Sequence, residues 1–355
     1  MDSSKPIRGR ATRSNRDARY LSTTRESYDD GWTGDDEYPL PLRTTVTEEH
    51  PKSIISRNKS SDVPFEQSIN PYRGCEHGCI YCYARPAHAY MDLSSGLDFE
   101  SRLFSKPNAA LLLKNELGKK NYRCSVICLG GNTDAYQPIE RQNRITRSIM
   151  EVLAECQHPV TIVSKSSLVE RDIDLLEPMA AIGLAQVFVS ITSLDRELSR
   201  RMEPRAAAPQ RRLKTIAALA NAGIPTGVMF APVIPALNDM HLEDVLEAST
   251  DAGAKYAGYV MLRLPGEVNG LFKEWLAQHY PLRADRVMNR VRDIRNGAEN
   301  DVKFGRRFKG TGAIAELVGQ RFRRSCRTNG LNQIPHIFNT KAFRSPTASS
   351  QMSLF

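Results

Sequence analysis

The sequence of 355 residues contains no apolar run near the roughly 20 residues that a membrane-spanning helix needs. Its N-terminus also has no apolar stretch of the kind that secretory signals carry, because it consists mainly of charged and small polar residues. The Arg-rich start resembles a transit peptide, but the acidic stretch from Asp29 to Glu37 argues against that interpretation. We therefore expect a cytoplasmic protein that makes no contact with a membrane.

The chain also lacks the even set of cysteines that a disulfide framework needs. It has seven cysteines, and three of them lie within eight residues. In a reducing compartment, such crowding indicates metal or cluster chemistry rather than disulfides. The other four have no motif spacing, and we expect them to be buried core thiols: Cys124, Cys128, Cys156 and Cys326.

The sequence has no extreme excess of charge of either sign, since 49 basic and 40 acidic residues give a net charge of +9. The surplus is uneven, because Arg283 to Arg327 holds 13 Lys and Arg residues against five Asp and Glu residues. Phe304, Phe308 and Phe322 are interleaved with these charges. Such a segment is typical of a surface that follows a phosphate backbone and stacks bases, or of a solvated helix face with a few core aromatics.

The apolar pattern divides the chain into four parts. Residues 1–60 are polar and charged without periodic apolar positions, which predicts a disordered N-terminal tail. Residues 61–280 carry regular strand and helix patterns, residues 281–343 form a basic extension, and residues 344–355 form a flexible tail. The helices expected in the extension are Ala284–Asn296 and Ala313–Arg324.

Within residues 61–280, short β-branched stretches alternate with segments of helical period. Ile145, Ile149 and Leu153 share one helix face, and Pro209 begins a second amphipathic helix. The alternation predicts about six βα units, hence a parallel sheet wrapped by helices, either open or closed into a partial or full barrel. The active site of such a fold lies at the C-terminal ends of the strands. The predicted strands are Gln67–Asn70, Ser125–Leu129, Val160–Val163, Gln186–Ile191, Thr226–Phe230 and Tyr256–Met261.

Three cysteines with the spacing Cys-x3-Cys-x2-Cys follow the first predicted strand. The thiolates of Cys75, Cys79 and Cys82 can ligate three irons of a [4Fe–4S] cluster and leave the fourth iron open. An open iron can bind the amino and carboxyl groups of a methionine moiety. Gly74 and Gly78 allow the backbone to turn tightly round the sulfur atoms.

A zinc site is the alternative interpretation of these thiols. Zinc takes four ligands, typically in paired Cys-x2-Cys knuckles, and no second knuckle lies nearby. His77 lies inside the loop, where its spacing is poor for a fourth ligand. The spacing therefore favours the iron–sulfur cluster.

The motif, with an aromatic residue before its third cysteine, resembles the hallmark of the radical S-adenosylmethionine (SAM) superfamily. The resemblance implies a partial (βα)6 TIM-like barrel that binds a [4Fe–4S] cluster and S-adenosyl-L-methionine. It also implies reductive cleavage of SAM to methionine and a 5′-deoxyadenosyl radical, which abstracts a hydrogen atom from a substrate. In the family the aromatic residue packs near the adenine, and Tyr81 occupies that place. An electron donor such as flavodoxin or ferredoxin is then an expected partner.

Residues 65–265 resemble the spore photoproduct lyase-like proteins of that superfamily. This resemblance implies a lyase-like radical reaction on nucleic acid, of the kind that serves DNA repair. In the lyase, a cysteine just before a Ser/Thr-Asp pair donates hydrogen, and Gly131 stands at that place here. Cys128 is expected to point to the other face of a regular strand, so we expect a substrate other than the thymine photoproduct. The segments that carry the resemblance are Cys79–Tyr83, Thr133–Asp134, Pro138–Glu140, Ser164–Ser166, Arg171–Leu176, Glu203–Arg205, Arg211–Arg212, Ala222–Pro225 and Ala231–Pro232.

Polar residues at the predicted strand ends are candidates for cofactor binding. Gly130, Gly131 and Thr133 are expected to accept the methionine ammonium, and an ordinary βα turn is the alternative interpretation. Lys165 and Ser190 are expected to bind the ribose or carboxylate of SAM, unless they are solvated rim residues or helix caps.

Three further residues are assigned roles at the same site. Arg205 is expected to pair with the carboxylate of SAM. Tyr83, which follows the third cysteine, and Asp134, of the Thr-Asp pair, are the candidate catalytic residues that the resemblance implies.

The final pentapeptide, Gln351–Phe355, resembles the peptide that binds the bacterial DNA sliding clamp. A polar tail that ends in apolar anchors is a common way to reach a hydrophobic pocket, and a frayed terminus is the alternative. Together these features favour a radical SAM enzyme acting on nucleic acid. A radical SAM enzyme acting on a peptide or small molecule, and a non-enzymatic iron–sulfur or zinc module that binds nucleic acid, are the alternatives.

Overall fold

The computed structural model describes residues 10–12, 14–15, 18–20 and 43–346. Its main sheet has seven strands in the order β10-β9-β8-β7-β6-β3-β2, and six of them are parallel. Only β2 runs antiparallel, beside β3 at one edge. The predicted parallel sheet of a partial barrel is therefore confirmed. The strands are β2 (Ile55–Arg57), β3 (Gln67–Ile69), β6 (Ile127–Leu129), β7 (Val160–Ser164), β8 (Ala185–Ser190), β9 (Thr226–Val233) and β10 (Tyr256–Met261).

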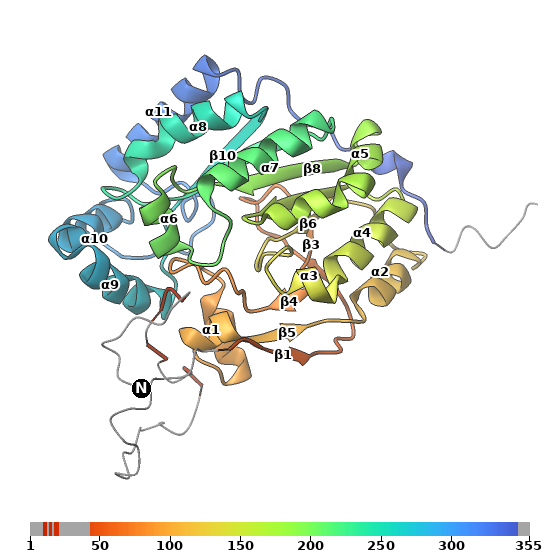
Figure 1. Cartoon of the computed structure of the whole chain (residues 1–355), viewed down its shortest axis with the longest axis horizontal. Coiled ribbons are helices and arrows are strands. Elements are labelled where there is room, and N and C mark those ends of the chain that lie inside the picture. Colours follow the sequence, from red (N-terminus) through yellow and green to blue (C-terminus); the bar gives the residue numbers. More distant parts are fainter. Residues whose placement is uncertain (1–9, 13, 16–17, 21–42, 347–355) are drawn as a thin grey trace, which may run out of the picture.

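Helices join the parallel strands and lie along the outside of the sheet (Figure 1). Ile145, Ile149 and Leu153 of α4 are buried, as their spacing predicts, and Pro209 is the first residue of α7. Their apolar faces share one hydrophobic core with the strands. The helices are α3 (Glu140–Asn143), α4 (Ile145–Glu155), α5 (Ile173–Ala181), α6 (Arg196–Met202), α7 (Pro209–Asn221) and α8 (Leu242–Asp251).

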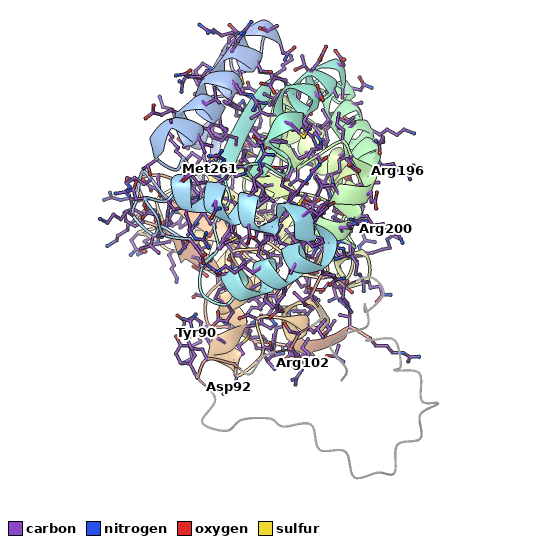
Figure 2. All side chains as sticks on the ribbon, turned by 90° about the vertical axis from the view of Figure 1, so that its left-hand side faces the viewer. Tyr90, Asp92, Arg102, Arg196, Arg200 and Met261 are labelled. Carbon is purple, nitrogen blue, oxygen red and sulfur yellow. The ribbon has the colours of Figure 1, made fainter. Side chains whose placement is uncertain are left out.

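A second, three-stranded sheet with the order β1-β5-β4 is formed largely by the chain between β3 and β6. In Figure 2, the labelled Tyr90, Asp92 and Arg102 mark this part below the main sheet, whose strand β10 ends at Met261. Its elements are β1 (Thr45–Glu48), β4 (Tyr72–Arg73), β5 (Arg102–Ser105), α1 (Leu97–Ser101), α2 (Ala109–Leu117) and the 3-10 helix η1 (Arg85–Met91).

The expectation of a tail without regular structure up to residue 60 is wrong for residues 45–57, which contain β1 and β2. All four residues of β1 are exposed, and the strand is held by parallel backbone pairing to β5. An edge strand of this kind needs no apolar face, so its polar composition gave no strand signal.

The C-terminal part packs on the barrel rather than standing apart from it. Helix α11 lies against α8 and β10, and Met261 of β10 donates a backbone hydrogen bond to Phe308. The peptide Gln351–Phe355, expected to bind a sliding clamp, lies outside the described residues. The elements are α9 (Val268–His279), α10 (Ala284–Asp293), α11 (Gly312–Thr328) and the 3-10 helices η2 (Ser167–Asp172), η3 (Asp239–His241), η4 (Pro281–Arg283) and η5 (Thr340–Ala342).

Among the described helices, none has both the length and the apolar character that crossing a bilayer requires.

Candidate active site

The three cysteines of the motif lie on one loop between β4 and η1, which we call the cluster loop (residues 74–84). Cys75 and Cys79 are buried, Cys82 is partly exposed, and all three thiols are free. Gly74 and Gly78 have φ angles of +74° and +64°, a region that side chains rarely adopt. A Cβ on Gly78 would lie 2.8 Å from a carboxylate oxygen of Glu100, so the turn leaves room only for glycine.

A fully buried arginine, Arg85, binds the backbone of the cluster loop. The guanidinium of Arg85 donates to the carbonyl oxygens of Cys79 at 2.9 Å and of Gly78 at 3.0 Å. It also pairs with Glu100 at 2.6 Å, and Glu100 accepts hydrogen bonds from the backbone and hydroxyl of Thr12. Charged hydrogen bonds of this kind are strong, so they stabilise this conformation of the loop. Sequence reasoning missed both residues, because no spacing rule relates them to the cysteines.

The chemistry of the donor set fits three irons of a [4Fe–4S] cluster. Burial raises the pKa of Cys79 to about 12, so this thiol keeps its proton until iron displaces it. In the described part of the chain, no three His, Cys, Asp or Glu side chains close round a single metal ion. His77, the candidate fourth ligand of a zinc site, instead has its Nδ1 3.3 Å from a carboxylate oxygen of Asp134.

Asp134, a candidate catalytic residue, lies where β6 and β7 end, with its side chain only 9% exposed against the cluster loop. Its carboxylate accepts hydrogen bonds from the Ser164 hydroxyl at 2.8 Å and from the backbone N–H of Lys165 at 2.7 Å and of Tyr136 at 2.9 Å. Burial by itself would raise the pKa of Asp134, but His77 and these N–H groups lower it to about 2. The carboxylate is therefore ionised at neutral pH, and it connects the cluster loop with the ends of β6 and β7.

Tyr81, the residue before the third cysteine, is buried beneath Lys165. The Nζ of Lys165 lies 5.8 Å from the centre of the Tyr81 ring, and the Tyr81 hydroxyl donates to Glu203. Glu203 also pairs with Arg212, and all three groups are buried. Two predicted cofactor residues, Tyr81 and Lys165, are thus brought together by the fold.

The remaining predicted residues surround the same strand ends. Gly130 has φ of +83°, and a Cβ there would lie 2.1 Å from the carbonyl oxygen of Val163. The Thr133 hydroxyl donates to the Tyr72 carbonyl at 2.9 Å, and the Ser190 hydroxyl lies 3.4 Å from the Ala231 carbonyl. These contacts place the predicted residues at the C-terminal ends of the parallel strands.

Two of the predicted residues connect the strand ends with the cluster loop. Arg205 pairs with Glu76 at 2.8 Å, so its charge is balanced by the residue that follows Cys75. Tyr83 donates its hydroxyl to the carbonyl oxygen of Gly131, which joins the cluster loop to the end of β6.

Cys128 is oriented differently from the expectation for a regular strand. Its Sγ lies 3.5 Å from the position that a Cβ on Gly131 would take. The reason is the turn at Gly130, whose left-handed conformation folds Gly131 back beside the strand. A thiol is therefore present next to the position where the sequence has glycine, and the expectation that it would lie on the far side is wrong.

Comparison with known proteins bears directly on this site. Residues 69–248 match the family described as the Radical SAM superfamily, which is half of the chain. The chain belongs to the radical SAM superfamily. An uncharacterised protein of Mycobacterium tuberculosis is 37% identical over 68% of this chain and 71% of its own length. One of Methanocaldococcus jannaschii is 30% identical over 63% of this chain and 80% of its own length.

Solved structures show the same fold. Spore photoproduct lyase complexed with dinucleoside spore photoproduct superimposes with a TM-score of 0.55 at 16% identity, covering 86% of each chain. As a radical SAM enzyme, this protein uses a [4Fe–4S] cluster and SAM as its cofactors. Cys75, Cys79 and Cys82 are the residues that would hold the cluster.

Proposed function

We propose that this radical SAM enzyme acts on nucleic acid, in a lyase-like reaction that serves DNA repair in the cytoplasm. The observation that carries the proposal is the position of the basic C-terminal segment. The backbone carbonyl of Phe308 accepts a hydrogen bond from Met261, at the end of β10, and the guanidinium of Arg263 contacts the rings of Phe308 and Tyr83. The part of the basic segment around Phe308 is therefore packed at the rim of the candidate site, where its charges can attract a phosphate backbone.

Each part of the site has a physical task in this reaction. The bound cofactors supply one-electron chemistry that removes a hydrogen atom from the substrate. Arg85 and the Asp134–His77 pair fix the cluster loop, so that the three thiolates are held in place. The burial of Cys75, Cys79 and Tyr81 keeps water from the reacting atoms, which protects a radical from side reactions. The thiol of Cys128, beside Gly131, places a hydrogen donor at the same strand end.

The proposal is tested by anaerobic reconstitution of the cluster, followed by reduction in the presence of SAM. We expect 5′-deoxyadenosine to form faster when ultraviolet-irradiated DNA is added. The Cys75→Ala/Cys79→Ala/Cys82→Ala variant should lose iron, sulfide and turnover together. Turnover that ignores DNA and RNA but responds to a peptide or small molecule would contradict the nucleic-acid substrate while leaving the radical chemistry intact.

The proposal extends to two protein partners. A donor of single electrons, such as flavodoxin or ferredoxin, is needed because the cluster must be reduced before SAM can be cleaved. The sequence Gln351–Phe355 supports binding to the DNA sliding clamp, which would bring the enzyme to DNA.

A further inference from the structure

Arg263 lies two residues beyond the C-terminal end of β10, at the rim of the candidate site. Its guanidinium carbon is 5.5 Å from the centre of the Tyr83 ring and 5.0 Å from the centre of the Phe308 ring. Tyr83 follows the third cysteine directly and is fixed by its hydroxyl hydrogen bond to Gly131. Arg263 therefore stands between the cluster loop and the basic segment.

The neighbouring arginines all have partners. Arg307 binds both carboxylate oxygens of Asp62, at 2.6 Å and 2.8 Å. Arg295 is almost fully buried and donates to the carbonyl oxygens of Leu262 at 2.6 Å and of Arg306 at 3.1 Å. These contacts hold the chain near Arg263, and both carboxylate oxygens of Asp62 are bound by Arg307.

Arg263 itself is different. Within the part of the chain that the structure describes, it makes stacking contacts but no hydrogen bond or ion pair, and its Nε is shielded from solvent without an acceptor. Burial lowers the pKa of Arg263, and the nearby charge of Arg307 lowers it further. A guanidinium stays protonated even so, and its charge is offset by the ring faces of Tyr83 and Phe308 and, without a direct contact, by the nearby carboxylate of Asp62.

The contacts with the two rings leave the N–H groups at the edge of the guanidinium without an acceptor in the described part of the chain. An oxyanion that approaches in the guanidinium plane would accept two of these N–H groups at once and would balance the charge. A phosphate or carboxylate has the required geometry. The contacts with the Tyr83 and Phe308 rings restrict the Arg263 side chain in advance, so little conformational entropy is lost on binding.

We propose that Arg263 binds a phosphodiester oxyanion of the substrate beside Tyr83. The inference rests on the proposed function, since it assigns the anion to nucleic acid. The carboxylate of SAM offers the same chemistry from another source, and the experiment separates the two.

The test measures binding of a fluorescently labelled single-stranded oligonucleotide to the full, cluster-loaded chain over a series of salt concentrations. For Arg263→Gln we expect about tenfold weaker binding, the loss of roughly one charged hydrogen bond. The slope of log K against log salt should become less negative by about 0.7, because one fewer counterion-releasing contact is made. Arg263→Lys should keep the slope, since it keeps the charge, but not the full affinity.

The matched control is Arg200→Gln, which removes one exposed positive charge on α6. Arg200 is exposed, and Figure 2 shows it apart from Met261, so this variant should bind the oligonucleotide like the wild type. The affinity for SAM, read from the EPR spectrum of the reduced cluster, should be unchanged in Arg263→Gln.

The possible failures are distinguishable. If Arg263→Gln bound the oligonucleotide with the same affinity and salt slope as the wild type, the role of Arg263 would be overturned. The proposed function would then still stand. If Arg263→Gln bound SAM more weakly but bound the oligonucleotide like the wild type, the anion at Arg263 would be the carboxylate of SAM. That result would also overturn the inference. A wild-type protein that binds no oligonucleotide would overturn both proposals.

Discussion

The hydroxyl of Tyr81 donates a hydrogen bond to the carboxylate of Glu203, although 122 positions of sequence separate the two residues. The same carboxylate pairs with Arg212 and accepts a hydrogen bond from Thr192 at 3.1 Å. All of these groups are buried. The cluster loop is thereby attached to the end of β8 and to α7 through one anion, whose charge Arg212 balances.

Removal of that anion should be costly. Glu203→Ala leaves Arg212 as an uncompensated buried charge, and we expect a loss of about 3–5 kcal/mol in the free energy of unfolding. Glu197→Ala is the control, because it breaks an exposed pair with Arg201 and should cost less than about 1 kcal/mol. Anaerobic urea denaturation measures both, and equal losses would contradict the assignment.

The turn at Gly78 is expected to depend on the absence of a side chain. In Gly78→Ala, the left-handed backbone costs about 1–2 kcal/mol, and the new Cβ also collides with Glu100. The protein should bind less iron and sulfide. Gly297→Ala separates the two effects, because Gly297 has φ of +83° but nothing within 4 Å of a Cβ. It should show the backbone cost with full iron content; loss of iron there as well would refute the steric argument.

A buried histidine should make stability depend on pH. Burial lowers the pKa of His158 to about 4, below its unfolded value of about 6.5, so the unfolded chain binds more protons in between. Stability is therefore present above pH 6.5 and is lost as the pH falls toward 4. From pH 7 to pH 5 this residue should account for about 2 kcal/mol.

The measurement compares the unfolding of wild type and His158→Gln at both pH values, which cancels acid effects that the two proteins share. The variant should lose less stability between pH 7 and pH 5. His50→Gln changes an exposed histidine and should follow the wild type. Identical pH profiles for wild type and His158→Gln would show that His158 does not control this range.

The thiol beside Gly131 should affect the substrate rather than the cofactors. In Cys128→Ala we expect unchanged iron content and unchanged 5′-deoxyadenosine formation, but fewer modified nucleotides per 5′-deoxyadenosine with ultraviolet-irradiated DNA. Cys156→Ala removes another buried thiol and controls for the loss of core packing. The same product ratio in both variants would rule out Cys128 as the hydrogen donor.

The terminal peptide should act independently of the site. Deletion of Gln351–Phe355 is expected to abolish capture by immobilised sliding clamp, because the apolar anchors Leu354 and Phe355 are removed. Cluster content should not change. Capture that survives the deletion would exclude this peptide as the binding element.

Local patterns in the sequence determined much of the fold. The six parallel strands, the buried face of α4 and the start of α7 follow from periodicity, because an apolar face must be covered wherever it occurs. The cysteine spacing and its glycines likewise predict the cluster loop, since both act over a few residues. Strand β1 escaped notice because pairing through the backbone leaves no apolar pattern.

Tertiary structure decided what surrounds the cysteines. Arg85 meets Glu100, His77 meets Asp134, and the orientation of Cys128 follows from one turn. Buried charges of this kind take whichever partner the fold brings near, and no local rule selects that partner. The sequence by itself thus determined the strands, the cluster motif and its chemistry. Only the folded chain decided how that motif is braced and which arginine remains available for an anion, because those contacts join residues far apart in the sequence.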